Sequence, residues 1–457
     1  MIPEIRKVYN AKFTDAAYNN FLNEINTMFE YPADFRISET PVFLTDDLTN
    51  LLVEASSEIS AQLLTPEFQE HSLHAIPEGW HVPGEPKHPE FLQIDFGITK
   101  DDKGNYIPKL IELQAFPTIY GYQYFLNKVI RKHFDIDNRF TPYFSGYNDE
   151  SYISALKDLI LNGHSPENVI LLEIQPEKQK TRIDFAATKK LIGIESVCIS
   201  KVFPKGDRLF YFKNNKETRI KRIYNRVIFD ELMKTNIKPG FIITNEFDVE
   251  CAGNPNWFYK ISKHSLPWLS SKFAPKAFFL NEFYKDSHSN DMQSFPRKSR
   301  SSSDSLSFPR RRESHDNVDR PGLSSSDSLS SSTSSLSYSR NHGSHVMPEN
   351  INLLDLSKYV LKPLFSFAGS GVEINPTKEK LDSIKDKQNY ILQEKIEYAP
   401  VIKTPDGNSK FEIRMMYFWK DKLVLVNNLV RMSKGKMMGV DYNKNKTWVG
   451  SSLALHR

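Results

Sequence analysis

Apolar residues in the first part of the chain recur at intervals of three and four. Over residues 14–70 this spacing is carried by Phe21, Ile25, Met28, Phe29, Leu48, Leu51, Leu52 and Ala55. Such a repeat places apolar side chains on one face of an α-helix. The pattern therefore predicts amphipathic helices in this region.

The middle of the chain shows short apolar runs around one helical stretch. A run at 169–174 is followed by helical spacing at 185–191, by Gly193, and by a second run at 197–202. Strand, helix, glycine and strand in this order predict a βαβ unit. We expect this unit to be continued and closed by further runs at 209–212, 222–228 and 240–243. The result would be a small Rossmann-like α/β domain without a nucleotide fingerprint.

Two further strands are predicted upstream, at 91–98 and 106–113. The residues Asp-Lys-Gly-Asn at 102–105 predict a hairpin turn between them. A four-residue loop would pair Asp101 with Tyr106 and so set the register of the hairpin.

This register places Asp95 directly opposite Glu112, and Gln114 shares their face by the alternation of a strand. Facing carboxylates repel at a cost of roughly 0.2–1 kcal/mol. A Mg²⁺ ion between them would reverse that sign, because it prefers hard oxygen ligands. The alternative is a solvated hairpin face, but simple exposure is disfavoured by the apolar neighbours Leu110, Ile111, Leu113 and Phe116.

A second candidate site follows Lys362, which comes directly after an apolar run at 359–361. The loop that follows, which includes Ala368, Gly369, Ser370 and Gly371, leads to a short strand at 372–374. Glycines let backbone N–H groups approach phosphate oxygens, and a lysine adds a point charge. The alternative is an ordinary hairpin with a surface lysine. The Gly-Lys-Ser/Thr of a Walker loop does not follow the glycines.

Composition narrows the class of protein. The chain has 457 residues, a net charge of +4 and two cysteines. So small a charge does not favour binding to nucleic acid or to an anionic membrane. Two cysteines exclude a disulfide scaffold and a cysteine-based zinc site. With no signal peptide and no apolar run of about 18 residues, we expect a soluble, cytoplasmic protein.

One segment, 287–345, differs from the rest because it is rich in serine and arginine. It repeats Ser-Phe-Pro-Arg at 294–297 and 307–310. Such a composition buries too little apolar surface to offset its conformational entropy. We interpret it as a disordered insertion in a folded domain, with RNA binding or phosphoregulation as the alternative.

Together the two candidate sites resemble a known family. Asp95, a hairpin and then Glu112-Leu113-Gln114 resemble the Mg²⁺ motif of ATP-grasp enzymes. Here this motif precedes the glycine loop, as it does in circularly permuted ATP-grasp proteins such as the synthetase domain of glutathionylspermidine synthetase. The resemblance covers residues 75–285 and 347–457, and further matches lie at 108–112, 262–269, 391–394, Arg431 and 451–456.

The chain departs from this family at several points. Gln114 replaces an asparagine, and Gln93 stands where the family often has a phosphate-binding arginine. Within residues 1–457 we expect no cysteine amidase domain before the synthetase-like region. A second metal motif, Asp441-Tyr442-Asn443, would fit the ordinary order. A basic cluster at 219–226 is either a site for a carboxylate substrate or a solvated strand face.

The resemblance implies an α+β or α/β fold: a circularly permuted ATP-grasp fold with a Rossmann-like pre-ATP-grasp domain. The implied domains are 1–150 (helical region and metal hairpin), 151–250 (Rossmann-like) and 251–457 (nucleotide-binding half with the insertion). The implied activity is a ligase that joins a small-molecule or peptide carboxylate to an amine or thiol, using ATP and Mg²⁺. Alternatives are a small-molecule kinase and an inactive ATP-binding scaffold.

The resemblance also implies the residues of the site. Arg431 and Lys362 would be catalytic, and Mg²⁺ would be held by Asp95, Glu112 and Gln114. ATP would contact Lys263, Lys362, Ser366, Ala368, Gly369, Ser370, Gly371, Gln393, Glu394 and Arg431.

Overall fold

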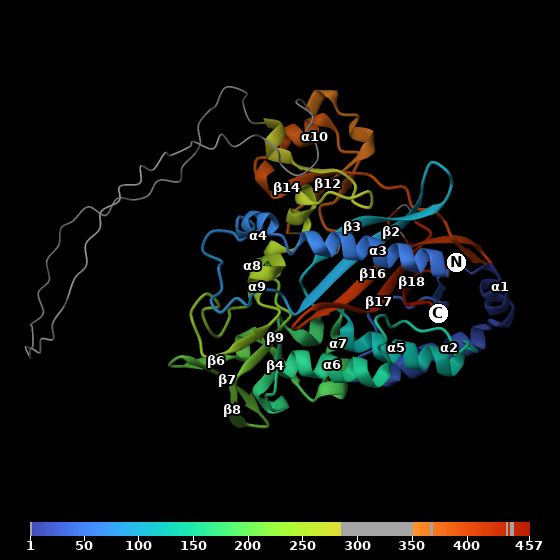
Figure 1. Cartoon of the computed structure of the whole chain (residues 1–457). Coiled ribbons are helices and arrows are strands. Elements are labelled where there is room, and N and C mark those ends of the chain that lie inside the picture. Colours follow the sequence, from blue (N-terminus) through green and yellow to red (C-terminus); the bar gives the residue numbers. More distant parts are fainter. Residues whose placement is uncertain (1, 285–350, 366–368, 436, 439–442) are drawn as a thin grey trace, which may run out of the picture. The chain divides into compact units, whose positions relative to one another are not determined.

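The computed structural model describes residues 2–284, 351–365, 369–435, 437–438 and 443–457 (Figure 1). The predicted insertion at 287–345 lies outside them, as do Ser366, Ala368, Asp441 and Tyr442. The elements described below belong to one compact unit, Met1–Phe283 with His342–Arg457. Within the described ranges, no helix has the length and apolar character needed to span a membrane.

The largest sheet combines strands from both ends of the sequence (Figure 1). Its order is β18-β17-β16-β2-β3, all neighbours are antiparallel, and β15 also pairs with β16. The strands are β2 (Phe91–Lys100), β3 (Tyr106–Gln114), β15 (Ile402–Thr404), β16 (Gly407–Trp419), β17 (Leu423–Ser433) and β18 (Gly450–Ser452). The predicted hairpin therefore forms and joins the C-terminal strands.

The register of the hairpin agrees with the prediction at one end only. Lys100, not Asp101, pairs with Tyr106, so the loop is one residue longer than expected. A β-bulge next to Asp95 shifts the register by one residue, and Asp95 does face Glu112. The extra residue in a bulge restores the alternation that the longer loop displaced.

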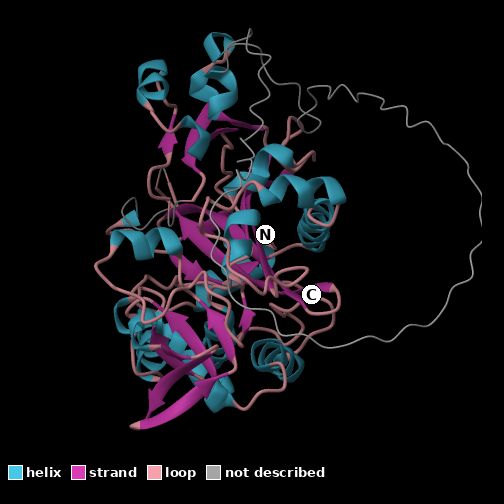
Figure 2. Cartoon of the chain, turned by 90° about the vertical axis from the view of Figure 1, so that its left-hand side faces the viewer, coloured by secondary structure: helices cyan, strands magenta, loops and turns pink. Residues whose placement is uncertain are grey.

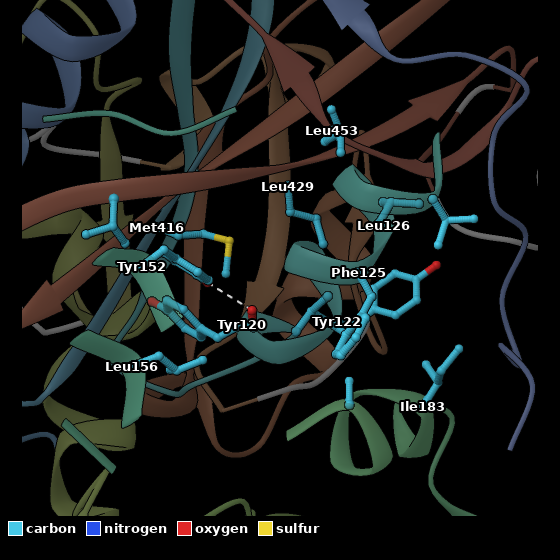
Figure 3. Close-up of a cluster of buried hydrophobic side chains, with 14 of the residues drawn as sticks. Tyr120, Tyr122, Phe125, Leu126, Tyr152, Leu156, Ile183, Met416, Leu429 and Leu453 are labelled. Atoms are coloured by element: carbon cyan, nitrogen blue, oxygen red, sulfur yellow. Dashed lines mark hydrogen bonds between the residues drawn. The ribbon is translucent and has the colours of Figure 1, made fainter. Parts of the chain in front are cut away.

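The two faces of this sheet differ in chemistry. Leu92, Ile94, Phe96 and Ile98 pack against helix α3 (Asp46–Gln62) in one buried cluster. The opposite face carries Gln93, Asp95 and Gly97, and its apolar end, at Phe91, joins a second cluster. Figure 3 labels Tyr120, Tyr152 and Met416 of this cluster. In that cluster the Tyr152 hydroxyl donates a hydrogen bond to the Tyr120 carbonyl.

The predicted N-terminal helices are confirmed. Threonine side chains cap α2, α3 and α4, each accepting a hydrogen bond from a first-turn N–H group. The helices of the first half are α1 (Pro3–Lys12), α2 (Asp15–Thr27), α3, α4 (Pro66–Leu73), α5 (Tyr120–His133), α6 (Asp149–Leu161) and α7 (Arg182–Ile192). Short strands β1 (Val42–Phe43) and β19 (Ala454–Leu455) pair in parallel.

The predicted βαβ unit is also confirmed, within a parallel sheet of order β10-β9-β4-β5. Helix α7 ends at Gly193, whose φ of 86° places it in the left-handed region that glycine tolerates. The strands are β4 (Val169–Glu173), β5 (Glu195–Cys198), β9 (Arg222–Asn225) and β10 (Glu250–Ala252).

Two of the runs that were expected to continue the parallel sheet do not join it. The run at 209–212 forms β7 in a separate antiparallel sheet, because Asn214 and Asn215 both adopt positive φ and close a tight hairpin. The run at 240–243 is not a strand; Phe241 and Ile243 pack on the core from a loop, and β10 closes the sheet instead. The separate sheet comprises β6 (Phe203–Lys205), β7 (Arg208–Lys213) and β8 (Lys216–Ile220).

A further antiparallel sheet carries the predicted glycine loop. Its order is β11-β14-β12-β13, and the loop joins β12 to β13. The strands are β11 (Ala277–Phe279), β12 (Tyr359–Pro363), β13 (Glu373–Ile374) and β14 (Tyr390–Glu394). Figure 2 shows strands in magenta and helices in cyan. The remaining helices are α8 (Phe229–Lys234), α9 (Pro255–Lys260), α10 (Lys378–Ser383) and the 3₁₀ helix η4 (Lys263–Trp268).

Candidate active site

A row of charged side chains crosses the polar face of the central sheet. Arg414 on β16 lies opposite Asp95 on β2, which lies opposite Glu112 on β3. Arg414 donates from Nε to Asp95 Oδ1 at 2.6 Å and from Nη2 to Oδ2 at 2.7 Å. Arg431 donates from Nη2 to the same Oδ2 at 2.7 Å. Both oxygens of the buried Asp95 carboxylate are therefore engaged by guanidinium groups.

The next row contains Glu412, which faces Arg431 on one side and Gly97 on the other. Arg431 Nη2 lies 3.0 Å from Glu412 Oε2, and the Tyr398 hydroxyl donates to the same carboxylate. A Cβ atom on Gly97 would lie 2.6 Å from Cε1 of Tyr398. Glycine at position 97 therefore leaves the space in which Tyr398 reaches Glu412.

Two glutamines connect the row to the end of the hairpin. Gln93 Oε1 accepts hydrogen bonds from Gln114 Nε2 at 2.6 Å and from Arg414 Nη1 at 3.1 Å. Gln93 Nε2 donates to the Thr118 carbonyl at 2.9 Å. Because the Gln114 amide nitrogen donates to Gln93, the side-chain carbonyl oxygen of Gln114 is the atom that remains for a ligand.

Two lysines from distant segments reach the same hairpin. Lys263, at the start of η4, lies 3.5 Å from Glu112 Oε2 through its Nζ atom. Lys362, on β12, donates to the carbonyl of Ile111 at 2.9 Å and to Gln393 Oε1 at 2.5 Å. Both lysine side chains are buried.

Charge interactions shift the pKa values of this cluster. Burial alone would raise the pKa of Glu112, but Lys263, Arg431, Lys362 and Arg414 together lower it to about 2. Burial lowers the pKa of Lys362 to about 8, although Glu112 opposes that shift. Burial raises the pKa of Glu412, against the attraction of Arg431. Glu112 is therefore ionised at neutral pH, and the Lys362 ammonium group begins to lose its proton slightly above neutral pH.

A cavity of about 660 Å³ opens in front of this cluster. That volume is typical of sites for small molecules. The charged side is lined by Glu112, Gln114, Lys263, Gly369, Arg414 and Arg431. Other parts of the wall come from Phe35, Arg36, Phe116, Thr118, Ile119, Thr181, Ile228, Phe258 and residues 443–447 and 449–451. The cavity can thus hold a polyanionic ligand beside the cations and a second molecule beyond it.

A smaller cavity of about 110 Å³ lies against the parallel sheet and is lined mainly by apolar side chains. It contains Cys251, and burial raises the pKa of this thiol. A protonated, buried thiol is a poor nucleophile. We therefore place the chemistry in the larger cavity.

The predicted nucleotide-binding residues occupy different positions around that cavity. Gly369, which has a φ of 77°, lines it, and Ser370 and Gly371 are exposed in the same loop. Gln393 is buried and bound to Lys362, while Glu394 Oε2 accepts from the Lys276 N–H group at 3.1 Å. The Gln393 carboxamide and the Glu394 carboxylate thus both bind protein groups in this structure.

Part of the predicted metal set fits a Mg²⁺ ion. Glu112 provides an ionised carboxylate on the cavity wall, and Gln114 provides an amide oxygen. Mg²⁺ commonly binds one or two protein oxygens together with substrate phosphates. Asp95 differs, since its side chain is 2% exposed and pairs with two arginines. Among the described residues, no group of three His, Cys, Asp or Glu side chains is placed to hold a metal.

The alternative metal motif is described only at Asn443. Its Oδ1 accepts hydrogen bonds from Ser433 Oγ at 2.9 Å, from the Lys434 N–H at 3.0 Å and from the Gly435 N–H at 3.1 Å. Three donors leave this oxygen little capacity for a metal. In the described part of the chain, Asn443 acts as a brace for its loop.

The basic cluster at 219–226 does not converge on one site. Arg219 pairs with Asp248, and Arg222 Nη1 lies 2.7 Å from Glu250 Oε2. Arg226 Nη1 lies 3.3 Å from the buried Asp184. These arginines therefore serve separate ion pairs.

Three residues of the cluster, Arg414, Glu412 and Tyr398, are not among the predicted site residues. A signal for Arg414 and Glu412 was present: they alternate with Phe411, Ile413 and Met415 in the otherwise apolar segment 411–419. Charged residues at every second position of a buried strand indicate a polar face.

Comparison with known proteins supports the fold. A scan against protein-family models finds no match, and a search of curated proteins finds none. Among solved structures, a glutathione synthetase-like effector from Globodera pallida in its apo form matches with a TM-score of 0.51. The match covers 93% of this chain and 96% of that chain at 9% identity. The chain therefore has a mixed α/β fold that resembles glutathione synthetase-like, ATP-grasp structures.

Proposed function

We propose that this protein is an ATP-dependent ligase that joins a carboxylate to an amine or thiol through an acyl phosphate. The observation that carries the proposal is that Glu112 and Lys263 line one cavity, while Lys362, from a third segment, donates to the carbonyl of Ile111 next to Glu112. In a fold of this class, this arrangement suits the binding of a triphosphate. The circularly permuted order is part of this proposal.

The residues of the cavity would divide the work. Lys263 and Lys362 would bind phosphate oxygens, and Glu112 with Gln114 would hold Mg²⁺, which shields charge on the phosphates when bound. The substrate carboxylate would take the γ-phosphoryl group and release ADP. An amine or thiol would then attack the acyl carbon, lose its proton and displace phosphate. Arg431 would neutralise charge on the transferred group.

The two alternatives differ in their products. A kinase would release ADP and keep the phosphoryl group on its product. A scaffold would bind nucleotide without turnover, and its motivation is the insertion at 287–345 between Lys263 and Lys362. The cavity extends from Lys263, Arg414 and Arg431 to a wall that includes Phe35, Phe116 and Phe258, which favours an enzyme with a second substrate.

Thermal unfolding with Mg-ATP, followed by ADP and phosphate release with amino acids, peptides and polyamines, tests the proposal. A ligase gives both products only when donor and acceptor are present together. Glu112→Gln should abolish the release, and Lys358→Ala, which removes an exposed lysine of the same sheet region, should not. Absence of any Mg-ATP stabilisation in the wild-type protein would refute the proposed function.

A further inference from the structure

We propose that Asp95 is a positioning residue that holds Arg414 and Arg431 as a paired site for the terminal phosphoryl group, and that it is not a metal ligand. This inference rests on the proposed function for the identity of the anion. The pairing itself is independent of that function. It follows from the hydrogen bonds around Asp95.

The Asp95 carboxylate is already satisfied by cations. Three guanidinium N–H groups reach it at 2.6, 2.7 and 2.7 Å. Arg414 makes the two-point contact that a planar guanidinium forms with a carboxylate. A Mg²⁺ ion on either oxygen would lie within a few ångströms of two positive charges. Such a site opposes a dication. Glu112 also lies near cations, but its ion pair with Lys263 is longer, at 3.5 Å, and its carboxylate lines the cavity.

Arg414 is oriented from two directions. Asp95 fixes Nε and Nη2, and Gln93 Oε1 fixes Nη1 at 3.1 Å. A guanidinium carries five N–H donors, so donors remain after these three contacts. Arg414 also lines the cavity. The remaining donors are therefore available to an anion that enters it.

Arg431 completes the pair from the next strand. Its Nη2 group bridges Asp95 and Glu412, at 2.7 and 3.0 Å. Its side chain is 39% exposed and lines the same cavity. The two carboxylates balance the charge of the two arginines, so the guanidinium groups can lie side by side without a bound ligand.

This arrangement also gives Gln93 a function. A glutamine at this position contributes an acceptor, and that acceptor binds both Arg414 and Gln114. Arg414 thus brings a guanidinium from the neighbouring strand to the side chain of Gln93. One amide side chain links the arginine pair to the metal side of the cavity.

The ligand preference of the pair is tested by comparing a non-hydrolysable ATP analogue with ADP. Calorimetry would give both affinities, and titration of Mg²⁺ would give its half-saturation point, for wild type, Asp95→Asn, Arg414→Gln and Glu112→Gln. We expect Asp95→Asn and Arg414→Gln to reduce the preference for the analogue over ADP about tenfold. Their Mg²⁺ half-saturation point should stay within about twofold of wild type, whereas Glu112→Gln should raise it about tenfold.

A shift of the Mg²⁺ half-saturation point by Asp95→Asn as large as that by Glu112→Gln would overturn the proposal. An unchanged preference for the analogue in Arg414→Gln would also overturn it. Asp248→Asn, which removes an exposed partner of Arg219, is the matched control for loss of one arginine pair.

A second measurement keeps the proposal open to test if the wild-type protein binds no nucleotide, a result that would end the proposed function alone. Thermal unfolding without ligand should show that Asp95→Asn destabilises the protein. The double variant Asp95→Asn/Arg414→Gln should recover part of that loss, because one unbalanced charge is removed. Inorganic phosphate should stabilise the wild type more than Arg414→Gln. Additive single-variant effects, or equal stabilisation by phosphate, would overturn the proposal.

Discussion

The central sheet and the domain built on the parallel sheet (the parallel domain) each contain a buried arginine–carboxylate pair, yet the two pairs differ in what surrounds them. Asp184 in the parallel domain accepts from the N–H groups of Ile119 and Tyr122 and pairs with Arg226. The Arg226 guanidinium lies over the rings of Phe116 and Phe185. The Asp95 carboxylate instead accepts hydrogen bonds from two arginines, and both of these arginines line a cavity.

This difference distinguishes a charge that is buried for a structural reason from a charge that is buried at a binding site. A buried ion pair is by itself weak evidence of function, because it also occurs where it joins a helix to a sheet. Asp184 joins the start of α5 to the end of β9 through such contacts. At Asp95 the cations have donors left over and a space in front of them. That combination indicates a binding site.

The largest effect should come from the structural pair. Asp184→Ala leaves the Arg226 guanidinium buried without its carboxylate and removes the acceptor of two N–H groups at α5. We expect the free energy of unfolding to fall by about 3–5 kcal/mol. Urea unfolding measures the loss. A loss below about 1 kcal/mol would show that the two pairs are not as different as the structure indicates.

Glu112→Gln should have the next largest effect, on chemistry rather than on stability. The substitution removes the ionised oxygen from the cavity wall and its ion pair with Lys263. We expect Mg-dependent ATP turnover to fall by roughly 100-fold or more, with only a modest drop in unfolding temperature from the lost ion pair. Asp441→Asn should be much milder in the same assay. The opposite ranking would move the metal to the C-terminal motif.

Lys362→Ala should weaken ATP binding or slow turnover by about tenfold, since one charged phosphate contact is worth roughly 1.4 kcal/mol. Calorimetry with ATP measures the affinity. Lys358→Ala, four residues earlier and exposed, is the control. Wild-type affinity in Lys362→Ala would remove this lysine from the site.

The pH dependence of binding should be smaller and has a defined sign. The pKa of Lys362 is lowered to about 8, so its ammonium is present below that pH and is lost above it. Affinity for ATP should therefore fall several-fold between pH 7 and 9. Lys362→Arg should flatten this profile, because a guanidinium stays charged. A flat profile in the wild type would contradict the assignment.

Deletion of residues 289–345 should have the smallest effect. Loop length enters closure entropy only logarithmically, and the composition of the segment buries little apolar surface. We expect folding and ATP binding to be nearly unchanged, as judged by unfolding temperature and calorimetry. An insoluble deletion variant would show that the segment is structural.

Some of the geometry of the candidate site could be predicted because its signals are local. The hairpin turn, the face shared by Asp95 and Glu112, and the lysine before the glycine loop are each visible within about twenty residues. The βαβ unit was likewise predicted from adjacent runs and Gly193.

What the sequence could not supply were the partners. Asp95 and Arg414 are 319 positions apart, and no local pattern pairs them. The bulge beside Asp95 and the engagement of Gln393 by Lys362 depend on packing between elements. The apolar residues at 240–243 likewise fit a strand and a loop that packs on the core equally well, so the sequence does not distinguish the two.

The central sheet has a consequence for synthesis of the chain. Strand β2 pairs with β16, more than 300 positions later. At about 5–20 residues per second, roughly 15–60 s separate the emergence of these strands from the ribosome. During that interval the backbone N–H and C=O groups along the β2 edge of the hairpin have no partner strand. Exposed strand edges of this kind promote aggregation. This protein should therefore depend on chaperones during translation more than a domain whose sheet is built from consecutive strands.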